Sequence, residues 1–476
     1  MESTSRNRFR VSTLSCVCAS IIVLVVVSTM IFDGDRGPFN FFTDFSVFKL
    51  EPSISVSIVE LQAKFSTSVR DHPSTNNANT TAVIVRKERA EEKMERGLAQ
   101  ARALIHKAAA SHPNMSLLAR DHQGLKESVY HNLAVFYQSY MEMEKRFKVY
   151  VYSEGDLPMV HNGPCKDIYA SEGRFIEEIE HGAKKFRTSD ADRAHVYFMP
   201  FSVTMMVKFL YRRATANREP LSRFVADYVT VVSAKYPFWN RTHGADHFML
   251  ACHDWGPYVS RANPLLYNSS IRVLCNANTS EGFDPRKDVS LPEIKLYGGV
   301  VNPKLLHPPT DNSSRPLLGF FAGGLHGPVR PLLLKHWKGR DAHLRVYEYL
   351  PKNLDYYTFM LQSKFCLCPS GYEVASPRIV EAIYAECVPV ILSSSYVLPF
   401  SDVLRWEAFS VQVNTSEIPR LKEVLMSVPE KKYKKLKEGV KAVRGHFTLN
   451  HPAKRFDMFH MILHSVWLRR LNLRSR

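Results

Sequence analysis

Short apolar runs alternate with amphipathic stretches from about residue 147 to the C-terminus. The short runs, rich in β-branched and aromatic residues, predict buried strands, and the stretches with a 3.6-residue period predict helices. Alternation of the two favours parallel sheets with crossover helices. The predicted strands are residues 147–152, 194–201, 247–252 and 270–275 in a first block and 315–323, 364–370 and 388–394 in a second, which also holds predicted helices at 329–337, 375–386 and 416–428.

The two blocks meet at a Pro- and Asn-containing stretch around residues 305–314. We therefore expect an α/β protein with two Rossmann-like halves that face each other across a cleft. In such halves a ligand binds beyond the carboxyl ends of the strands, so residues that directly follow a strand are the first candidates for a functional site.

Residues 11–32 form an uncharged run that is long enough to cross a hydrocarbon core of about 30 Å. Arginines precede this run and aspartates follow it, so the positive-inside rule places the short N-terminus in the cytoplasm. The alternative is a cleaved signal peptide, whose apolar region is usually shorter. We expect a type II membrane anchor with the bulk of the chain in the lumen.

The segment after the anchor shows no sustained period and predicts a stem. From residue 86 to residue 110 an apolar stripe predicts one helix, which could pack on another chain or on the protein's own body. The expected organisation is a cytoplasmic tail at 1–10, the anchor at 11–32, a lumenal stem with a helical segment at 33–145, an N-terminal acceptor half at 146–312 and a C-terminal donor half with the last helices at 313–476.

The 476-residue chain has 63 Lys and Arg against 46 Asp and Glu, a net charge of +17 that favours an anionic partner. Several Asn-x-Ser/Thr triplets agree with lumenal exposure, which argues against nucleic acid as that partner. Six of the eight cysteines lie outside the predicted anchor, and an oxidising lumen permits disulfides among them, although the sequence selects no pairing.

Neither the cysteines nor the aspartates show the spacing of a metal site. Cys366 and Cys368 are one residue apart, closer than the C-x2-C of structural zinc. Asp190 and Asp192 precede an apolar run instead of following a strand, which is typical of a solvated turn. We therefore predict no metal and no other cofactor.

A glycine turn follows the first predicted strand of the second block. Gly323 and Gly324 end the strand, and a short loop leads to Arg330 at the start of a helix. Glycines let backbone N–H groups approach a phosphate, and the helix dipole favours negative charge there. The spacing matches neither G-x-G-x-x-G nor a P-loop, and the alternative is a tight turn without a ligand.

The stretch around residues 370–386 gives a stronger signal. Ser376 suits an N-cap and Pro377 the first helical position, so Arg378 falls in the first turn, where its charge opposes the helix dipole. A bound anion would relieve that conflict, and Glu381 on the same face could accept hydrogen bonds from ribose hydroxyls. The alternative is a surface ion pair between Arg378 and Glu381.

Residues 365–406, which contain this stretch, closely resemble the exostosin family, glycosyltransferase family 47, in particular its plant cell-wall members. The resemblance extends over residues 147–158, 190–203, 236–257 and 319–330 and so covers the chain from about Phe147 to the C-terminus. It implies a Golgi type II protein of GT-B fold, an inverting enzyme that moves a sugar from a nucleotide diphosphate donor to a glycan. By this resemblance the donor site should contain Gly323, Arg330, Ser370, Gly371, Ser376, Arg378 and Glu381.

Inversion also requires a general base near the acceptor hydroxyl, and we expect it from the N-terminal half. Asp254 and His253 directly follow a predicted strand and are the first candidates, with Asp246 and His247 before that strand as the next. The alternative is that the His253–Asp254 pair only holds a turn.

The sequence therefore predicts a membrane-anchored Golgi enzyme that uses a uridine diphosphate sugar to build pectin or hemicellulose, without a nucleic acid partner and with possible homo- or hetero-oligomers among Golgi glycosyltransferases. The alternative is a catalytically silent subunit that binds glycan or holds a partner enzyme.

Overall fold

The computed structural model describes residues 77–110, 125–309 and 315–473, with side chains from residue 90 onward. The predicted anchor at 11–32 and the tail at 1–10 lie outside these ranges. Among the helices that are described, none is both long and apolar enough to cross a bilayer. Residues 76–476 form one unit, within which both of the sheets described below lie.

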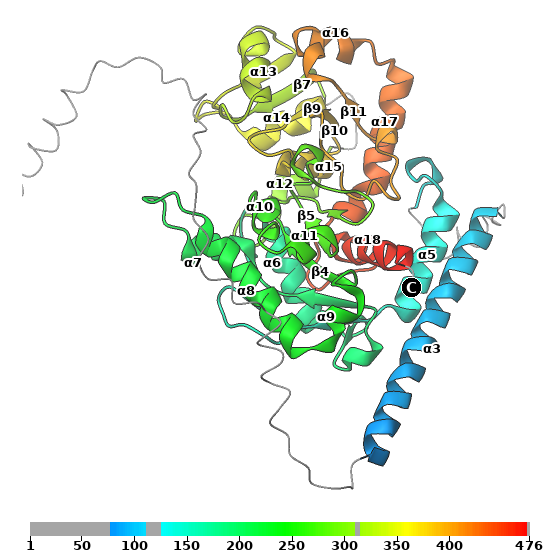
Figure 1. The fold of residues 1–476 in the computed structure, drawn as a ribbon. Helices are drawn as coiled ribbons and strands as arrows, with labels where there is room; N and C mark the ends of the chain where they lie inside the picture. The colour runs from blue at the N-terminus through cyan, green and yellow to red at the C-terminus, as the bar shows by residue number, and fades with distance from the viewer. Residues whose placement is uncertain (1–76, 111–124, 310–314, 474–476) are drawn as a thin grey trace, which may run out of the picture. The chain divides into compact units, whose positions relative to one another are not determined.

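The first half is built on a six-stranded parallel sheet in the order β2-β1-β3-β4-β5-β6. Figure 1 labels two of its strands, β4 and β5. Its central strands are buried on both faces, so they are continuous apolar runs and do not alternate with polar residues. The strands are β1 (Val149–Val151), β2 (Arg187–Thr188), β3 (Val196–Met199), β4 (His247–Ala251), β5 (Ile271–Leu274) and β6 (Val289–Ser290). The helices of this half are α5 (Leu133–Arg146), α6 (Ala170–Glu177), α7 (Val203–Leu210), α8 (Glu219–Lys235), α9 (Pro237–Thr242), α10 (Gly256–Ser260) and α11 (Pro264–Asn268).

The second half is built on a five-stranded parallel sheet in the order β11-β10-β9-β7-β8. Its strands are β7 (Leu317–Ala322), β8 (Leu344–Tyr347), β9 (Ser363–Pro369), β10 (Val388–Leu392) and β11 (Val411–Gln412). The helices are α12 (Pro303–Leu306), α13 (Val329–Trp337), α14 (Tyr356–Gln362), α15 (Pro377–Tyr384), α16 (Leu421–Met426), α17 (Glu430–Val443) and α18 (Met458–Asn472). The expected α/β architecture with two parallel sheets is confirmed.

One predicted helix differs from the observed structure. Residues 416–428 begin as the 3-10 helix η7 (Thr415–Arg420) and become α-helical only at α16. Pro419 lies inside η7 and lacks the N–H that an α-helix would need there, so the prediction of one continuous helix was wrong.

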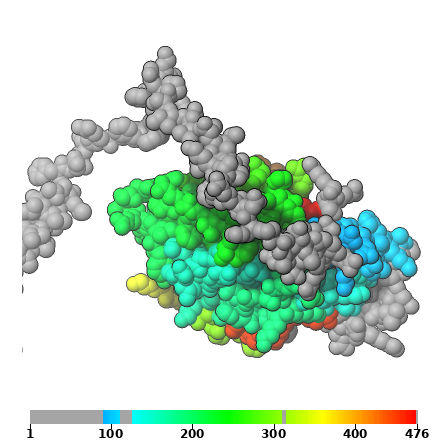
Figure 2. Space-filling view, turned by 60° about the horizontal axis from the view of Figure 1, so that its bottom comes forward, coloured from blue at the N-terminus to red at the C-terminus, as the bar shows by residue number. Residues whose placement is uncertain are grey.

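Two segments outside the sheets pack against the first half. The last helix, α18, returns to contact β5, β6 and α5, and Arg470 donates a hydrogen bond to the carbonyl of His195 at 2.9 Å. The helix α3 (Asn77–Ala110) packs on α5, and Arg102 donates to the last carbonyls of α18 at 2.7 and 2.9 Å. Figure 2 shows α3, in blue, beside the cyan surface of this half. Of the two partners considered for this helix, the structure therefore shows the protein's own body, while the domain limits predicted from the sequence stay a prediction.

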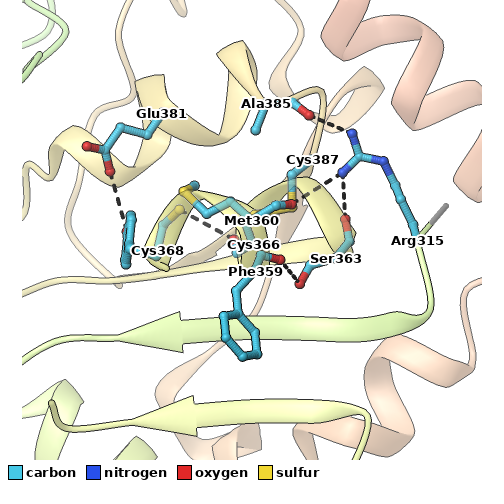
Figure 3. Close-up of a disulfide and its surroundings, with 10 residues drawn as sticks. Arg315, Phe359, Met360, Ser363, Cys366, Cys368, Glu381, Ala385 and Cys387 are labelled. Carbon is cyan, nitrogen blue, oxygen red and sulfur yellow. Dashed lines mark hydrogen bonds between the residues drawn. A yellow bond between two sulfur atoms is a disulfide. The ribbon is translucent and has the colours of Figure 1, made fainter. Parts of the chain in front are cut away.

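Each sheet has a disulfide between cysteines that lie in or next to its strands. Cys252–Cys275 joins the residues that follow β4 and β5, and Cys366–Cys387 joins β9 to the residue before β10. Cys165 and Cys368 are free thiols. In Figure 3 the guanidinium of Arg315 points at the carbonyls of Ser363 and Ala385, with N···O distances of 2.8 and 2.5 Å, and so ties the start of β7 to the end of α15.

Candidate active site

A cavity of about 700 Å³ lies at the carboxyl ends of β7, β8 and β9. The second half supplies most of its lining, from the loops after these strands and the first turns of α13 and α15. The first half and the segment that follows β6 face this lining with Tyr169, Asp254, Glu293 and Lys295. The cavity is therefore shared by the two halves, at the place where the parallel topology predicts a ligand.

Two arginines, Arg330 buried and Arg378 half-buried, bring positive charge into the cavity. Arg330 lies in the first turn of α13 and Arg378 in the first turn of α15. The Nε atoms of both are buried and have no hydrogen-bond partner among the described residues. Burial and the charge of Arg378 lower the pKa of Arg330 to about 10. Two like charges with unused donors are costly in a buried position, and an anion in the cavity would stabilise both.

Glycines make room for these arginines. A Cβ atom at Gly323 would lie 2.6 Å from a terminal nitrogen of Arg378, which donates a hydrogen bond to the carbonyl of Ala322 at 3.0 Å. A Cβ atom at Gly371 would lie 2.9 Å from a terminal nitrogen of Arg330. Both glycines line the cavity, so the loops after β7 and β9 approach the guanidinium groups closely only because these positions lack a side chain.

The helix start predicted at Ser376 is observed. Its side chain accepts a hydrogen bond from the N–H of Arg378, and Pro377 is the first residue of α15. Ser376 lines the cavity, whereas Ser370 does not: its hydroxyl donates to the carbonyl of Leu392 at 3.4 Å, between β9 and β10.

Glu381 lines the cavity one turn after Arg378. It does not form the exposed ion pair with Arg378 that was the alternative at the sequence level. Its side chain is buried, and it accepts hydrogen bonds from Tyr357 at 3.1 Å and Tyr356 at 3.4 Å. Burial raises its pKa above the ordinary range of a glutamate. The two tyrosines hold the carboxylate in place and leave it acceptor capacity toward the cavity.

Asp254 follows β4 and faces the arginine side from the first half. Tyr169 donates a hydrogen bond to its Oδ1 at 3.0 Å, and burial raises its pKa. The end of β4 is rigid because the buried carboxylate of Glu172 accepts the N–H of Cys252 at 2.7 Å, and Cys252 is also tied by its disulfide. Asp254 is thus a positioned carboxylate at the wall of the cavity.

Three further carboxylates line the cavity that the sequence did not reveal: Glu293, Glu348 and Glu373. Glu348 pairs with Lys338 at 2.6 Å. Glu293 is 6% exposed, and burial followed by the negative charge of Asp254 raises its pKa to about 8. The pKa of Glu373 is also raised to about 8, by burial and by the charges of Glu281 and Asp254. Glu293 lies in an irregular segment after a two-residue strand, and its position just beyond the end of β6 is the one signal that could have indicated it.

The other base candidates lie away from the cavity lining. His253 accepts a hydrogen bond from the N–H of Trp255 at 3.1 Å, and burial lowers its pKa to about 4. Asp246 and His247 are buried and bonded to one another at 2.8 Å, and Asp246 also pairs with Arg241 at 2.9 Å. These contacts hold the start of β4, so this pair has a structural role.

The aspartates at 190 and 192 form a turn, as predicted, in which Asp190 is exposed and Asp192 half-buried. Asp190 accepts the N–H of Asp192 at 3.1 Å and caps the short helix η3 (Ala191–Arg193). Among the described residues no group of three or more His, Cys, Asp or Glu side chains is arranged to hold a metal ion. The expectation that no metal is needed stays a prediction.

The cavity brings two cations and several carboxylates together in a way that suits group transfer. Arg330 and Arg378 occupy the side of the second half, and Asp254 stands opposite with Glu293 beside it. Cations of this kind stabilise a departing diphosphate, and a carboxylate opposite them can take a proton from an attacking hydroxyl.

Comparison with known proteins agrees with this chemistry. The family model of the Exostosin GT47 domain matches residues 143–428, which include both sheets and most of the cavity lining. The chain belongs to the exostosin GT47 family. It is therefore a glycosyltransferase.

Similar GT47 relatives come from plants. The chain is 62% identical to "Probable glycosyltransferase At5g25310" of Arabidopsis thaliana over 382 residues, 80% of this chain and 79% of the relative. It is 50% identical to "Probable glycosyltransferase At5g03795" of the same plant, over 89% of this chain and 82% of the relative. A more distant relative is "Probable beta-1,4-xylosyltransferase IRX10" of Arabidopsis thaliana, 29% identical over 67% of this chain and 82% of the relative.

Among solved structures the chain matches "Crystal structure of Anabaena Alr3699/HepE in complex with UDP-glucose", with 11% identity and a TM-score of 0.34 over 67% of this chain and 98% of the other.

Proposed function

We propose that this GT47 protein is an inverting glycosyltransferase of GT-B type that binds a nucleoside diphosphate sugar, with uridine as the expected base, in the cavity between its two halves. Its acceptor is a cell-wall polysaccharide of the pectin or hemicellulose class. It works in the Golgi as a single-pass type II membrane protein, anchored by residues 11–32.

The observation that carries this proposal is the pair of incompletely bonded arginines at the carboxyl ends of β7 and β9, Arg330 buried and Arg378 half-buried. Arg330 and Arg378 both line the cavity, and each has a buried Nε without a partner in the described part of the chain. A diphosphate supplies several acceptor oxygens and negative charge, which suit the unused donors of these two groups. Glu381 stands beside Arg378, where it can accept hydrogen bonds from ribose hydroxyls.

The reaction is a single displacement at the anomeric carbon. Asp254 takes the proton of an acceptor hydroxyl, and the acceptor oxygen forms a bond to the anomeric carbon from the face opposite the diphosphate. The bond between that carbon and the diphosphate oxygen breaks, and the nucleoside diphosphate leaves with the electron pair. Arg330 and Arg378 stabilise the charge that develops on the leaving group.

Two observations support a lumenal location. The chain has an uncharged run at its N-terminus with positive residues before it. Two disulfides join cysteines on the strands of the two sheets, as is common in secretory compartments and rare in the cytosol.

A binding screen with the full-length protein tests the donor site. We expect uridine diphosphate to raise the thermal transition by mass action and Arg378→Ala to remove most of this shift. Arg286→Ala is the matched control, because the Arg286 side chain is 89% exposed and pairs with Asp284 on the surface. An unchanged response of Arg378→Ala would remove this arginine from the site, and no response of the wild type to any nucleoside diphosphate would contradict the proposal.

A turnover assay separates the enzyme from the alternative, a silent glycan-binding or scaffold subunit. The protein is incubated with a panel of nucleotide sugars and oligosaccharide acceptors, and products are detected by mass. Asp254→Asn should lose turnover and keep nucleotide affinity, because it keeps the shape of the side chain and removes the base. Nucleotide binding without turnover on any acceptor would favour the silent subunit.

A further inference from the structure

A basic loop lies beside the end of β4, outside the cavity. It comprises residues 211–218 and joins α7 to α8, two helices that lie side by side (Figure 1). Arg212, Arg213 and Arg218 are exposed in this loop. Within the described part of the chain no ion pair joins any of the three to an acidic side chain. We call residues 211–218 the arginine loop.

A continuous series of aromatic contacts connects the arginine loop with the cavity. The guanidinium of Arg218 lies 4.3 Å from the centre of the Trp255 ring, and the Tyr211 ring meets the same tryptophan edge-on at 4.8 Å. The Trp255 ring lies 5.3 Å from the His253 ring, which lies 5.0 Å from the ring of Tyr169. Tyr169 lines the cavity and donates a hydrogen bond to Asp254, so this series of contacts between half-buried side chains leads to the proposed base.

The two kinds of side chain on this surface indicate one kind of ligand. Aromatic rings bury the apolar faces of sugar rings, and a polar edge keeps them suited to a hydrated partner. Guanidinium groups bind carboxylates through paired, charge-assisted hydrogen bonds. A neutral glycan would use the rings and give Arg212 and Arg213 no anionic partner. A glycan of uronic acid units satisfies both, because each unit presents a ring face and a carboxylate.

The donor does not account for these arginines. Its diphosphate is assigned to Arg330 and Arg378, which belong to the second half, whereas the arginine loop belongs to the first half. From residue 203 to residue 227 the chain has five basic side chains and two acidic ones, Glu219 and Asp227, so the positive charge is concentrated on the acceptor side.

We infer that the arginine loop and Trp255 bind the acceptor, and that this acceptor is an acidic glycan that contains uronic acid residues. The inference rests on the proposed function, since it names the substrate class of the same site. The glycan lies along the aromatic contacts, its carboxylates bond to the guanidinium groups, and its end reaches Asp254.

Calorimetric titration of the full-length protein tests this inference with two matched probes. One probe is an oligogalacturonide of defined length, and the other is the same oligomer with its carboxylates methyl-esterified. We expect the acid form to bind the wild type more tightly than the ester. The triple variant R212A/R213A/R218A should bind the acid form about tenfold more weakly or worse, because it loses several charge-assisted hydrogen bonds, and should keep its affinity for uridine diphosphate.

Two further variants control for net charge and for folding. K431A/K432A/K434A removes three exposed lysines from α17 and should keep the affinity for both probes. R212A/R213A leaves the contact between Arg218 and Trp255 in place and should show an intermediate loss. Unchanged affinity in the triple variant, equal affinity of the wild type for acid and ester, or an equal loss in the lysine variant would each overturn the inference.

The outcomes also separate this inference from the proposed function. If the wild type binds uridine diphosphate but shows no preference for the acid oligomer, the inference fails and the proposed function stands. If the wild type binds no nucleoside diphosphate, the proposed function fails, and the inference fails with it because it rests on that function. A membrane is the other possible partner. If the wild type binds vesicles of phosphatidylserine and phosphatidylcholine but not the oligomer, and the triple variant loses vesicle binding, the arginine loop binds a membrane and the inference is overturned.

Discussion

Asp254 and Glu293 form a pair of carboxyl groups whose pKa values are raised by the same cavity but to different extents. Burial raises both, and the charge of Asp254 adds to the rise at Glu293, whose pKa is about 8. An aspartate starts from a lower ordinary pKa than a glutamate, and the hydrogen bond from Tyr169 favours the ionised form of Asp254. Near neutral pH we therefore expect Asp254 to be the ionised base and Glu293 to be protonated.

This assignment predicts an alkaline limb in the pH profile. As the pH rises through about 8, Glu293 ionises and places a second negative charge beside Asp254 and toward the donor diphosphate. We expect kcat/KM to fall over this range, because kcat/KM reports ionisations of the free enzyme. Glu293→Gln keeps the neutral form at every pH, so this variant should retain activity at pH 7 and show a weaker alkaline limb. Glu373, whose pKa is also about 8, accounts for the limb that remains.

The comparison variant is Asp254→Asn, which should be inactive across the whole pH range if Asp254 is the base. A Glu293→Gln variant that is inactive at pH 7, together with an active Asp254→Asn, would exchange the two roles. Steady-state rates between pH 6 and 9 distinguish these cases, and the nucleotide thermal shift shows that each variant is folded.

Single residues of the site were predictable where they follow a long strand in the sequence. Arg378 and Ser376 come soon after β9 and open a helix with a clear N-cap and proline, so their neighbourhood was readable from the chain alone. Glu293 and Tyr169 could not be predicted, because they lie in irregular segments and line the cavity only through the packing of the two halves against each other. The catalytic roles of all these residues stay predictions.

At the scale of elements, α3 shows how an apolar stripe selects its partner. Met94, Leu98 and Ala101 are buried, whereas Leu104, which belongs to the same predicted stripe, is 39% exposed. The helix is therefore packed along part of its length, against α5 and the end of α18. The sequence predicted the stripe but could not identify this surface, which is assembled from residues far apart along the chain.

Substitution of two leucines on α3 tests this packing. Leu98→Ala should lower the free energy of unfolding by about 2–5 kcal/mol, because it leaves a cavity in a closed interface. Leu104→Ala removes the same atoms from an exposed position and should change it by about 0.5 kcal/mol at most. Urea denaturation of both variants measures the difference, and equal effects would mean that α3 does not pack on the body as described.

Short strands mark the limit of prediction for the elements. β2, β6 and β11 have two residues each, too few to show a period, and they occur at the edges of their sheets. The longer strands β7, β9 and β10 are continuous apolar runs, and the sequence located them within a few residues. The site lies at β7, β8 and β9, and the sequence located β7 and β9 but not β8, so part of the side formed by the second half followed from elements that the sequence revealed.

At the scale of the molecule, the C-terminal segment connects the two halves. After the second sheet the chain passes through α17 and returns in α18 to the first half, where Arg469 donates to the carbonyl of Asp288 at 3.0 Å. The local sequence of α18 does not predict which half it packs on, because the helix is buried on nearly all sides and has no polar face. Around this junction lie several histidines that are buried in the neutral state.

His446 is the best defined of these histidines. Its Nδ1 lies 2.6 Å from the carbonyl oxygen of Phe456, which can only accept, so Nδ1 carries the proton and Nε2 accepts from the hydroxyl of Tyr130 at 2.6 Å. Burial lowers the pKa of His446 to about 4, and it lowers the pKa values of His195 and His464 to about 3. All three are therefore neutral in the folded protein well below the ordinary histidine pKa.

The sign of the pH dependence follows from the protons bound in each state. Below pH 6.5 the unfolded chain protonates these histidines and the folded protein does not, so the unfolded state binds more protons and stability falls as the pH falls. The contribution is complete above about pH 6.5 and is lost toward pH 4. Glu293 and Glu373 act in the opposite direction between pH 8 and about 4.5, because their raised pKa values make the folded state bind more protons there.

A histidine variant isolates one of these contributions from the rest. His446→Gln keeps an N–H donor for Phe456 but cannot be protonated, so it should be less stable than the wild type at pH 7 and lose less stability on acidification. Between pH 7 and pH 5 the wild type should lose about 2 kcal/mol more than this variant, from about 1.4 kcal/mol per pH unit below 6.5. His343→Gln changes an exposed histidine and should keep the slope of the wild type. Urea denaturation at pH 7, 6 and 5 measures all three proteins, and parallel slopes for His446→Gln and the wild type would show that this buried ring does not make the folded state sensitive to acid.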